Sequence, residues 1–230
     1  MSVVTCSNLS KTYQAEHVPV HALRRVDLVV ESGDFVSLSG PSGSGKSTLL
    51  NIIGGLDRAD DGLVQVGGVE LGALNNRDLA SLRLNKIGFV FQAYNLIPVL
   101  SAQENVEFIL QLQNVPAAPR RERATAVLEQ LGLGDMCHRR PGELSGGQQQ
   151  RVAIARAIVT EPLLLLADEP TANLDSATTD ELLQLLRSLN TEHQMTIVTA
   201  THDPQVMAFT TRQVHLKDGQ IASDERVALA

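Results

Sequence analysis

Gly-Pro-Ser-Gly-Ser-Gly-Lys-Ser, residues 40–47, decides the fold of this chain, because it matches the phosphate-binding pattern G-x-x-x-x-G-K-[ST]. An apolar run at residues 35–38 precedes it, and a helix-like apolar run at residues 48–53 follows it. Strand, glycine loop and helix in this order are the context that the pattern needs. The glycines let several backbone N–H groups point inward, where they and the positive end of the helix attract phosphate oxygens.

The charged and hydroxyl side chains of this phosphate loop have separate predicted roles. Lys46 is expected to reach the β- and γ-phosphates of a nucleotide, and Ser47 is expected to hold Mg²⁺. The alternative, a glycine turn that merely precedes a buried helix, is disfavoured by the loop and its flanks together. The residues of this segment predicted to bind nucleotide are Gly40, Pro41, Ser42, Gly43, Ser44, Gly45, Lys46, Ser47 and Thr48.

Length and composition indicate one large domain and argue against nucleic-acid binding. The chain has 230 residues, of which 43% are hydrophobic, so a substantial core is available. Its aromatic residues are five Phe and two Tyr, with no Trp, too few for a platform that stacks single-stranded nucleic acid. The net charge of −7 argues against a DNA-binding surface, which usually carries a basic excess.

The sequence predicts an intracellular protein with reduced thiols. No apolar stretch reaches the ~20 residues that a membrane-spanning helix requires. The N-terminus lacks the basic region and long apolar segment of a secretion signal. Cys6 and Cys137 lie far apart without C-x-x-C spacing, so a disulfide or a cysteine metal site is not expected.

Strand-like and helix-like segments alternate along the chain, which predicts an α/β fold with a parallel-sheet core. Residues 3–9 and 20–30 are predicted strands near the N-terminus. From about residue 95 to 160 the pattern becomes helical, with a capping-box start at Ser101. We therefore expect a single domain, residues 1–230, with a core of about 1–94 and 161–230 and an inserted helical lobe of about 95–160.

Two acidic residues follow the most apolar run of the sequence. Residues 163–167 are typical of a strand buried on both faces of a parallel sheet, and open α/β sheets bind ligands at the carboxyl ends of such strands. Asp168 is expected to coordinate Mg²⁺, directly or through water, and Glu169 to act as general base for an attacking water. The alternative is a strand that ends in an acidic turn before Pro170.

Leu-Ser-Gly-Gly-Gln, residues 144–148, is the most discriminating pentapeptide of the chain. Ser145 is expected to cap a helix that runs from about 146 to 160. Two glycines in a first turn cost roughly 1 kcal/mol each relative to Ala. A sequence tolerates them where bare N–H groups must closely approach something such as an anion. The alternative is a flexible loop before a helix.

In this order, the phosphate loop, the pentapeptide and Asp168-Glu169 resemble the nucleotide-binding domain of ATP-binding cassette (ABC) ATPases, over about residues 3–219. The resemblance implies a P-loop NTPase fold, with a RecA-like parallel-sheet core, an N-terminal antiparallel β subdomain and the inserted helical lobe. It implies ATP and Mg²⁺ as cofactors. The residues it places in catalysis are Lys46, Gln92, Glu169 and His202, and those on the metal are Ser47, Gln92 and Asp168.

The resemblance also gives roles to weaker markers. Tyr13 is implied to stack on adenine, Gln92 to sense the metal and the γ-phosphate, and His202 to contact the γ-phosphate as a switch. Residues 173–175 resemble a loop that crosses a dimer interface. A lone Tyr or His is more often a packing residue, but here order and spacing around three strong motifs favour the functional roles.

A head-to-tail homodimer is a further implication of the resemblance. The pentapeptide of one copy would close over ATP held by the phosphate loop of the other, and a second helix N-terminus would exclude water and add donors. Hydrolysis would then remove the charge that holds the dimer together and so produce an opening motion. The pentapeptide residues expected to bind nucleotide in this way are Ser145, Gly146, Gly147 and Gln148.

Within the family, residues 54–57, 88–98 and 167–175 resemble the lipoprotein-releasing and macrolide-efflux group. That group implies integral membrane permease subunits with a periplasmic domain. It also implies a cytoplasmic location, bound peripherally to the inner face of a bacterial inner membrane. The alternative is a cell-division-type ATPase that regulates a periplasmic process without moving a substrate. Ala172, where glycine is frequent, and the residues before His202 depart from the group pattern without touching a phosphate contact.

The segment 94–112 is expected to face the membrane partner. Its apolar residues could line a groove for a short cytoplasmic helix or belong to ordinary core between the lobes. The residues concerned are Leu96, Ile97, Val99 and Leu100.

Three other classes explain the sequence less well. A soluble ABC protein acting on nucleic acid or ribosomes typically has two cassettes or a long coiled coil, and this chain has neither. A small-molecule kinase leaves residues 144–148 and His202 unexplained. A regulatory module with a degenerate site is disfavoured because every reactive position is filled. The cargo cannot be read from this chain.

Overall fold

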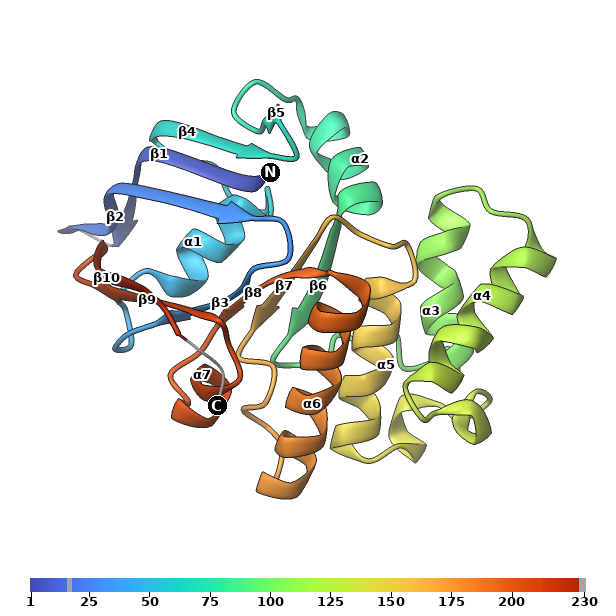
Figure 1. Cartoon of the computed structure of the whole chain (residues 1–230). Coiled ribbons are helices and arrows are strands. Elements are labelled where there is room, and N and C mark those ends of the chain that lie inside the picture. Colours follow the sequence, from blue (N-terminus) through green and yellow to red (C-terminus); the bar gives the residue numbers. More distant parts are fainter. Residues whose placement is uncertain (16–17, 228–230) are drawn as a thin grey trace.

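In the computed structural model, which describes residues 1–15 and 18–227, the chain folds around two β-sheets (Figure 1). The smaller sheet has the strand order β2-β1-β4-β5, and the larger has the order β10-β9-β3-β8-β7-β6. The strands are β1 (Ser2–Ala15), β2 (Val18–Glu31), β3 (Phe35–Ser39), β4 (Asp61–Val66), β5 (Val69–Glu70), β6 (Ile87–Phe91), β7 (Leu164–Asp168), β8 (Thr196–Ala200), β9 (Arg212–Lys217) and β10 (Gln220–Arg226). The helices are α1 (Lys46–Ile53), α2 (Asn76–Lys86), α3 (Ala102–Leu112), α4 (Ala117–Gln130), α5 (Gly146–Ile158), α6 (Ser176–His193) and α7 (Pro204–Ala208), with short 3-10 helices at Gly134–Met136 and Pro141–Glu143.

The smaller sheet is antiparallel throughout, which confirms the expected N-terminal β subdomain. Its first two strands extend further than predicted, because residues 10–15 continue β1 and pair with the start of β2. Most side chains of this extension are polar, and the facing residues at the start of β2 are exposed. Backbone hydrogen bonds between the strands, rather than a buried apolar face, define this end of the hairpin. It therefore carries no hydrophobic period from which it could be predicted.

The larger sheet confirms the predicted parallel core. The neighbouring strands β9, β3, β8, β7 and β6 all run parallel, and β10 adds an antiparallel edge. Strand β7 is buried on both faces. Leu164 and Leu166 pack into one hydrophobic cluster, while Leu165 and Ala167 pack into another. This two-sided burial is why the sequence there reads as a continuous apolar run instead of an alternating one.

Helix α1 lies between the two sheets, as Figure 1 shows. Its apolar side chains, among them Leu49, Leu50 and Ile53, are fully buried in the cluster that both sheets share. Packing on both sides holds the helix in place. The phosphate loop that leads into α1 is therefore held at a defined position beside the carboxyl ends of the parallel strands.

The helical lobe comprises α3, α4 and α5, and α5 stands between α3 and the larger sheet (Figure 1). The predicted capping box is present: Ser101 Oγ accepts from the Glu104 N–H, and the Glu104 carboxylate accepts from the Ser101 N–H at 2.8 Å. Since α5 packs on both α3 and β6, lobe and core share one hydrophobic cluster. The division at about residues 95 and 160 therefore stays a prediction. Within the described residues, no helix has the length and apolar character to span a bilayer.

Candidate functional site

The phosphate loop joins β3 to α1, in the predicted strand–loop–helix arrangement. Gly40 and Gly45 adopt positive φ angles of 138° and 103°, which L-residues rarely adopt. Each also lies against backbone: a Cβ on Gly40 would come within 2.1 Å of the Leu216 carbonyl oxygen, and one on Gly45 within 2.4 Å of that of Ala22. Gly45 is the N-cap of α1, and no side chain caps the helix. The first N–H groups of α1 are thus left for a ligand.

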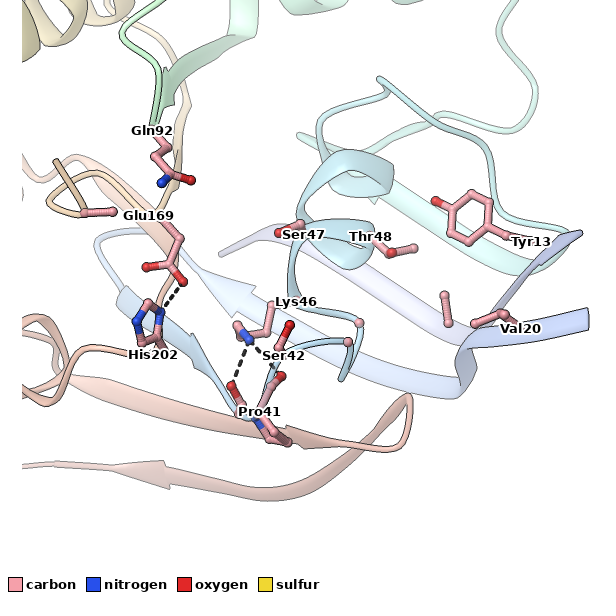
Figure 2. A pocket seen from close by; sticks show the side chains of 15 residues that line it. Tyr13, Val20, Pro41, Ser42, Lys46, Ser47, Thr48, Gln92, Glu169 and His202 are labelled. Atoms are coloured by element: carbon pink, nitrogen blue, oxygen red, sulfur yellow. Dashed lines mark hydrogen bonds and ion pairs between the residues drawn. The ribbon is translucent and has the colours of Figure 1, made fainter. Parts of the chain in front are cut away.

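Lys46 folds back over its own loop (Figure 2). Its Nζ donates to the carbonyl oxygens of Gly40 at 2.8 Å and Pro41 at 3.0 Å. In the part of the chain that the structure describes, no carboxylate forms a salt bridge with this largely buried ammonium group. Its charge is therefore balanced only by carbonyl dipoles, which favours an anion beside it.

Ser47 and Asp168 meet at the carboxyl end of β7. Ser47 Oγ donates to Asp168 Oδ1 at 3.1 Å. Burial raises the pKa of the Asp168 carboxyl; the hydrogen bond from Ser47 opposes this, and the charge of neighbouring Glu169 adds to it. A hydroxyl and a carboxylate at the same point form an oxygen donor set of the kind that Mg²⁺ prefers. The pair therefore fits the metal predicted for it.

Glu169 follows β7 in a left-handed conformation, with φ of 47°, which is uncommon for a residue other than glycine. Its N–H donates to the Ala200 carbonyl oxygen at 2.9 Å, so the chain stays bound to β8 as it turns. Its Oε1 lies 2.7 Å from His202 Nδ1, and Figure 2 shows the two side chains facing each other near the phosphate loop. The carboxylate side chain is 18% exposed and the imidazole 74% exposed. The second ring nitrogen of His202 is thus available to a ligand.

Gln92 follows the end of β6 on the same side of the site as Glu169 and His202 (Figure 2). Its carbonyl oxygen accepts from Asn173 Nδ2 at 2.9 Å, while its side chain is exposed. The contact joins the end of β6 to the segment 173–175. This places the predicted metal-sensing glutamine next to the predicted interface loop.

A cavity of about 760 Å³ lies over these residues. Its size falls within the range of small-molecule sites. It brings together most of the side chains predicted to act on one nucleotide, although Ser44 is buried beneath the loop and Asp168 is reached through Ser47. The lining residues are Tyr13, Val20, Ala22, Gly40, Pro41, Ser42, Gly43, Gly45, Lys46, Ser47, Thr48, Gln92, Glu169, Ala172 and His202.

The pentapeptide residues do not line this cavity. They lie at the N-terminus of α5, where Ser145 Oγ accepts from the Gln148 N–H at 3.3 Å and Gln148 Oε1 accepts from the Ser145 N–H at 2.9 Å. This reciprocal capping confirms that Ser145 caps the predicted helix. Within one chain, therefore, the structure separates residues 145–148 from the phosphate loop.

Both glycines of the pentapeptide also have a packing reason inside one chain. A Cβ on Gly147 would come within 2.2 Å of Thr178 Cγ2 on α6, and one on Gly146 within 2.9 Å of Tyr94 Oη. The first turn of α5 therefore packs closely on two neighbouring segments. The sequence suggests either approach to an anion or a flexible loop for these glycines, because the contact with α6 depends on tertiary structure and has no local signal.

Two polar residues of α5 that the sequence did not single out hold the segments beside the cavity. The Arg156 guanidinium donates to the carbonyl oxygens of Tyr94 at 2.9 Å and Asn95 at 2.5 Å, where both residues have positive φ. Burial lowers the pKa of Arg156. Gln150 Nε2 donates to the Pro170 carbonyl oxygen at 2.7 Å from a fully buried position. Helix α5 is thus bonded to the segment after Gln92 and to the one after Glu169.

A second cavity, of about 430 Å³, is mostly apolar and lies among α2, β6, α3 and α5; we call it the lobe groove. Of the four residues predicted to line a groove, only Ile97 lines this one. Leu96 packs into the hydrophobic cluster shared by lobe and core, and Val99 is 72% exposed. The left-handed bend at residues 94–95 turns this segment, so β6 and α3 supply most of the apolar wall. The lining residues are Leu56, Arg83, Leu84, Ile87, Gly88, Phe89, Phe91, Asn95, Ile97, Phe108, Ile109, Arg156, Ala157 and Thr160.

Known proteins resemble the chain along nearly its whole length. Residues 23–172 match the ABC transporter family. An uncharacterized ABC transporter ATP-binding protein of Thermotoga maritima is 50% identical over 94% of this chain and 92% of its own length. MJ0796 of Methanocaldococcus jannaschii, also an uncharacterized ABC transporter ATP-binding protein, is 45% identical over 98% of this chain and 97% of its own.

A longer relative and a solved structure add to this comparison. The macrolide export ATP-binding/permease protein MacB of Syntrophobacter fumaroxidans is 47% identical over 96% of this chain, but the match covers only 31% of MacB. Among solved structures, dimeric MJ0796 in a post-hydrolysis state bound to ADP and Pi superposes with a TM-score of 0.90. It is 45% identical, and the match covers 98% of this chain and 99% of MJ0796.

Proposed function

Because the chain belongs to the ABC transporter family, as an ATP-binding cassette that hydrolyses ATP to drive transport, we propose that two copies of it close around two Mg²⁺–ATP complexes and thereby move membrane permease subunits. One observation carries the dimer: the pentapeptide at residues 145–148 lies outside the cavity that holds the other predicted nucleotide-binding residues. The dimeric MJ0796 structure, bound to ADP and Pi, supports it.

We assign the cavity to one nucleotide. The adenine stacks on Tyr13 at one end, and the phosphates lie in the loop, where Lys46 and the first N–H groups of α1 face them. Mg²⁺ would be held by Ser47, Asp168 and Gln92. When bound, the metal neutralises charge on the β- and γ-phosphates. The neighbouring Ser47 and Asp168 oxygens support this assignment, because they are 3.1 Å apart and belong to different elements.

For hydrolysis, Glu169 accepts the proton of the attacking water. The 2.7 Å contact with His202 orients this carboxylate, and the other nitrogen of the imidazole is directed to the γ-phosphate. Lys46 stabilises the negative charge that develops on the transferred phosphoryl group. The small exposed fraction of Glu169 limits its access to bulk water, which strengthens these charge interactions.

The second copy completes each site. The N-terminus of α5 carries two glycines and a serine, so its backbone N–H groups and the Ser145 hydroxyl can approach a γ-phosphate held by another chain. Because these residues do not line the cavity of their own chain, we assign them to the site of a second copy. Loss of the γ-phosphate charge then weakens the contact between the copies, and the dimer opens.

Ser145→Arg tests the proposed dimer. Hydrolysis is expected to fall about a hundredfold or more, because the longer cationic side chain blocks closure at the helix N-terminus. Nucleotide binding to the single chain is expected to change little, since Ser145 does not line its own cavity. Fluorescent-nucleotide titration and phosphate release measure the two effects. Ser81→Arg, at an exposed position of α2, is the matched control.

A mixture of inactive variants decides whether Ser145 acts across the dimer. A heterodimer of Ser145→Arg and Lys46→Ala combines the intact loop of one copy with the intact pentapeptide of the other at one of its two sites. We expect partial hydrolysis from the mixture and almost none from either variant alone. Failure of the mixture to recover activity, with nucleotide binding lost in Ser145→Arg, would place Ser145 in the site of its own chain.

The lobe groove is the proposed docking site for the permease. Its walls are apolar and Phe108 is 37% exposed there, so it can hold the apolar face of a short helix. In MacB the matching region is part of an ATP-binding/permease protein. We propose that a permease with a periplasmic domain binds this face and holds the chain at the cytoplasmic side of the inner membrane.

Phe108→Asp tests the groove. The carboxylate would be buried on docking, so we expect capture of the permease from detergent-solubilised membranes to fall about tenfold or more. ATP hydrolysis by the isolated variant should be unchanged, since Phe108 does not line the nucleotide cavity. Val99→Asp, exposed outside the groove, is the control. Equal capture of a polytopic membrane protein by both variants, measured by mass spectrometry, would contradict docking in the groove.

A further inference from the structure

The hydroxyl group of Tyr13 is hydrogen-bonded to a carboxylate outside the nucleotide cavity. Tyr13 Oη donates to Asp57 Oδ2 at 2.6 Å, and Lys11 Nζ donates to the other oxygen, Oδ1, at 3.0 Å. Asp57 is not among the residues that line the cavity. Both of its oxygens are thus used within the chain, and one of them fixes the orientation of a ring whose face is expected to meet the nucleotide.

Lys11 restricts the ring from a second direction. Its Nζ lies 5.1 Å from the centroid of the Tyr13 ring and also donates to the Arg58 carbonyl oxygen at 2.7 Å. A cation within about 6 Å of a ring face is attracted to it. With this face occupied, the opposite face of the ring is the one left for a base.

The loop that carries Asp57 continues the phosphate-binding helix. The N–H groups of Leu56 and Asp57 both donate to the Asn51 carbonyl oxygen in the last turn of α1, at 2.8 and 3.3 Å. On the same loop, Asp60 Oδ2 accepts from the Thr12 N–H at 2.6 Å. The phosphate loop therefore leads into one end of α1, and the segment that follows the other end forms hydrogen bonds with residues 11–13.

The protonation states support a hydrogen bond of fixed direction. Burial acts to raise the pKa of Asp57, but the hydrogen bonds from Tyr13 and Lys11 outweigh it and lower the pKa, so the carboxylate is ionised at neutral pH. Burial and the neighbouring Asp57 raise the pKa of the Tyr13 phenol. Tyr13 is therefore the donor and Asp57 the acceptor.

We infer that Asp57 is a positioning residue for nucleotide recognition. Together with Lys11, it holds the Tyr13 ring at a fixed distance from the phosphate loop. The inference rests on the proposed stacking of adenine on Tyr13. A ring held in place before binding loses little freedom when the base arrives, so the stack contributes more to affinity. Asp57 should then affect the binding affinity only of ligands that carry a base.

Two mild variants test the positioning role. Tyr13→Phe keeps the stacking face and removes the hydrogen bond, and Asp57→Asn keeps the shape and removes the charge. We expect each to raise the KM for ATP about three- to tenfold. For Asp57→Asn we expect less than a twofold change in kcat. Affinity for inorganic tripolyphosphate, which has no base, should be unchanged in both. Asp61→Asn is the control, since Asp61 is exposed and nearby and, among the described residues, its carboxylate accepts only from the Gly62 N–H.

The double variant and Tyr13→Ala distinguish a failure of the positioning role of Asp57 from a failure of the proposed adenine stacking. If both residues act through one bond, Tyr13→Phe with Asp57→Asn should weaken ATP binding no more than either change alone. If Tyr13→Ala weakens ATP binding but neither mild variant does, the positioning role is wrong and stacking stands. If Tyr13→Ala also has no effect, the stacking itself is wrong. An equal loss of tripolyphosphate affinity in Asp57→Asn would mean that Asp57 merely stabilises the loop, which also overturns the inference.

Discussion

Glu169→Gln is expected to bind ATP as tightly as the native chain and to hydrolyse it about a thousandfold more slowly. The amide cannot take the proton of the attacking water, and loss of a positioned general base typically reduces rates by about 10² to 10⁴. The amide also lacks the negative charge that we place beside the γ-phosphate, so its substitution should favour the ATP-bound closed state. We therefore expect the variant to elute from size exclusion as a dimer in ATP with Mg²⁺ and as a monomer in ATP with EDTA. Phosphate release gives the rate.

A matched substitution on the surface controls for loss of an acidic charge. Glu192→Gln, exposed on α6, should hydrolyse ATP at the native rate and should not be trapped as a dimer. Native turnover in Glu169→Gln would show that another group activates the water. A variant that binds ATP without hydrolysing it, yet elutes as a monomer at all nucleotide concentrations, would contradict the closed dimer while leaving the base assignment in place.

The elements around the phosphate were predictable because their sequence signals are local. The loop at residues 40–47 needs glycine where φ is positive, and β7 needs apolar side chains at residues 164–167 because both faces are buried. Ser101 and Ser145 mark the starts of helices, because each forms a capping box, a pair of reciprocal hydrogen bonds with the residue three positions later. In each case the sequence signal lies within one short segment.

What the sequence left unpredicted depends on contacts between distant segments. Arg156 and Gln150 lie among polar positions of an amphipathic helix, a pattern that ordinarily indicates exposure to water, yet each bonds a carbonyl group beside the site. Asp57 lies after a helix and far in sequence from the ring of Tyr13, to which it bonds. The residue types along the sequence do not reveal these hydrogen bonds, because each one depends on a single carbonyl or hydroxyl group of another element.

The pentapeptide shows how one motif can meet two requirements. Its glycines let α5 pack on Thr178, and they also suit the approach to phosphate that we propose for the N-terminus of α5. Thr178 belongs to the first turn of α6, whose N-cap Asp175 lies in the predicted interface loop. Thr178 also donates to the Asp175 side chain through its N–H and its hydroxyl, so the first turn of α5 packs on a residue that is bonded to that loop.

Lys46→Ala is expected to weaken ATP binding by at least about a hundredfold and to abolish turnover. The ammonium group lies against the loop backbone, where, among the described residues, it donates only to the Gly40 and Pro41 carbonyls. Removing it leaves these two oxygens facing the phosphates without a cation between them, so attraction is replaced by repulsion. Isothermal titration with ATP measures the loss. Lys217→Ala, an exposed lysine on β9, should bind normally.

The affinity result for Lys46→Ala separates binding from chemistry when it is compared with Glu169→Gln. Both variants stop hydrolysis, but one should fail to form the ATP-dependent dimer and the other should accumulate it. The loop can fold without the lysine, because α1 is fixed by apolar packing between the two sheets, so an unchanged melting temperature is expected without nucleotide. Unimpaired hydrolysis by Lys46→Ala would refute the assignment of the cavity, since no other described lysine lines it.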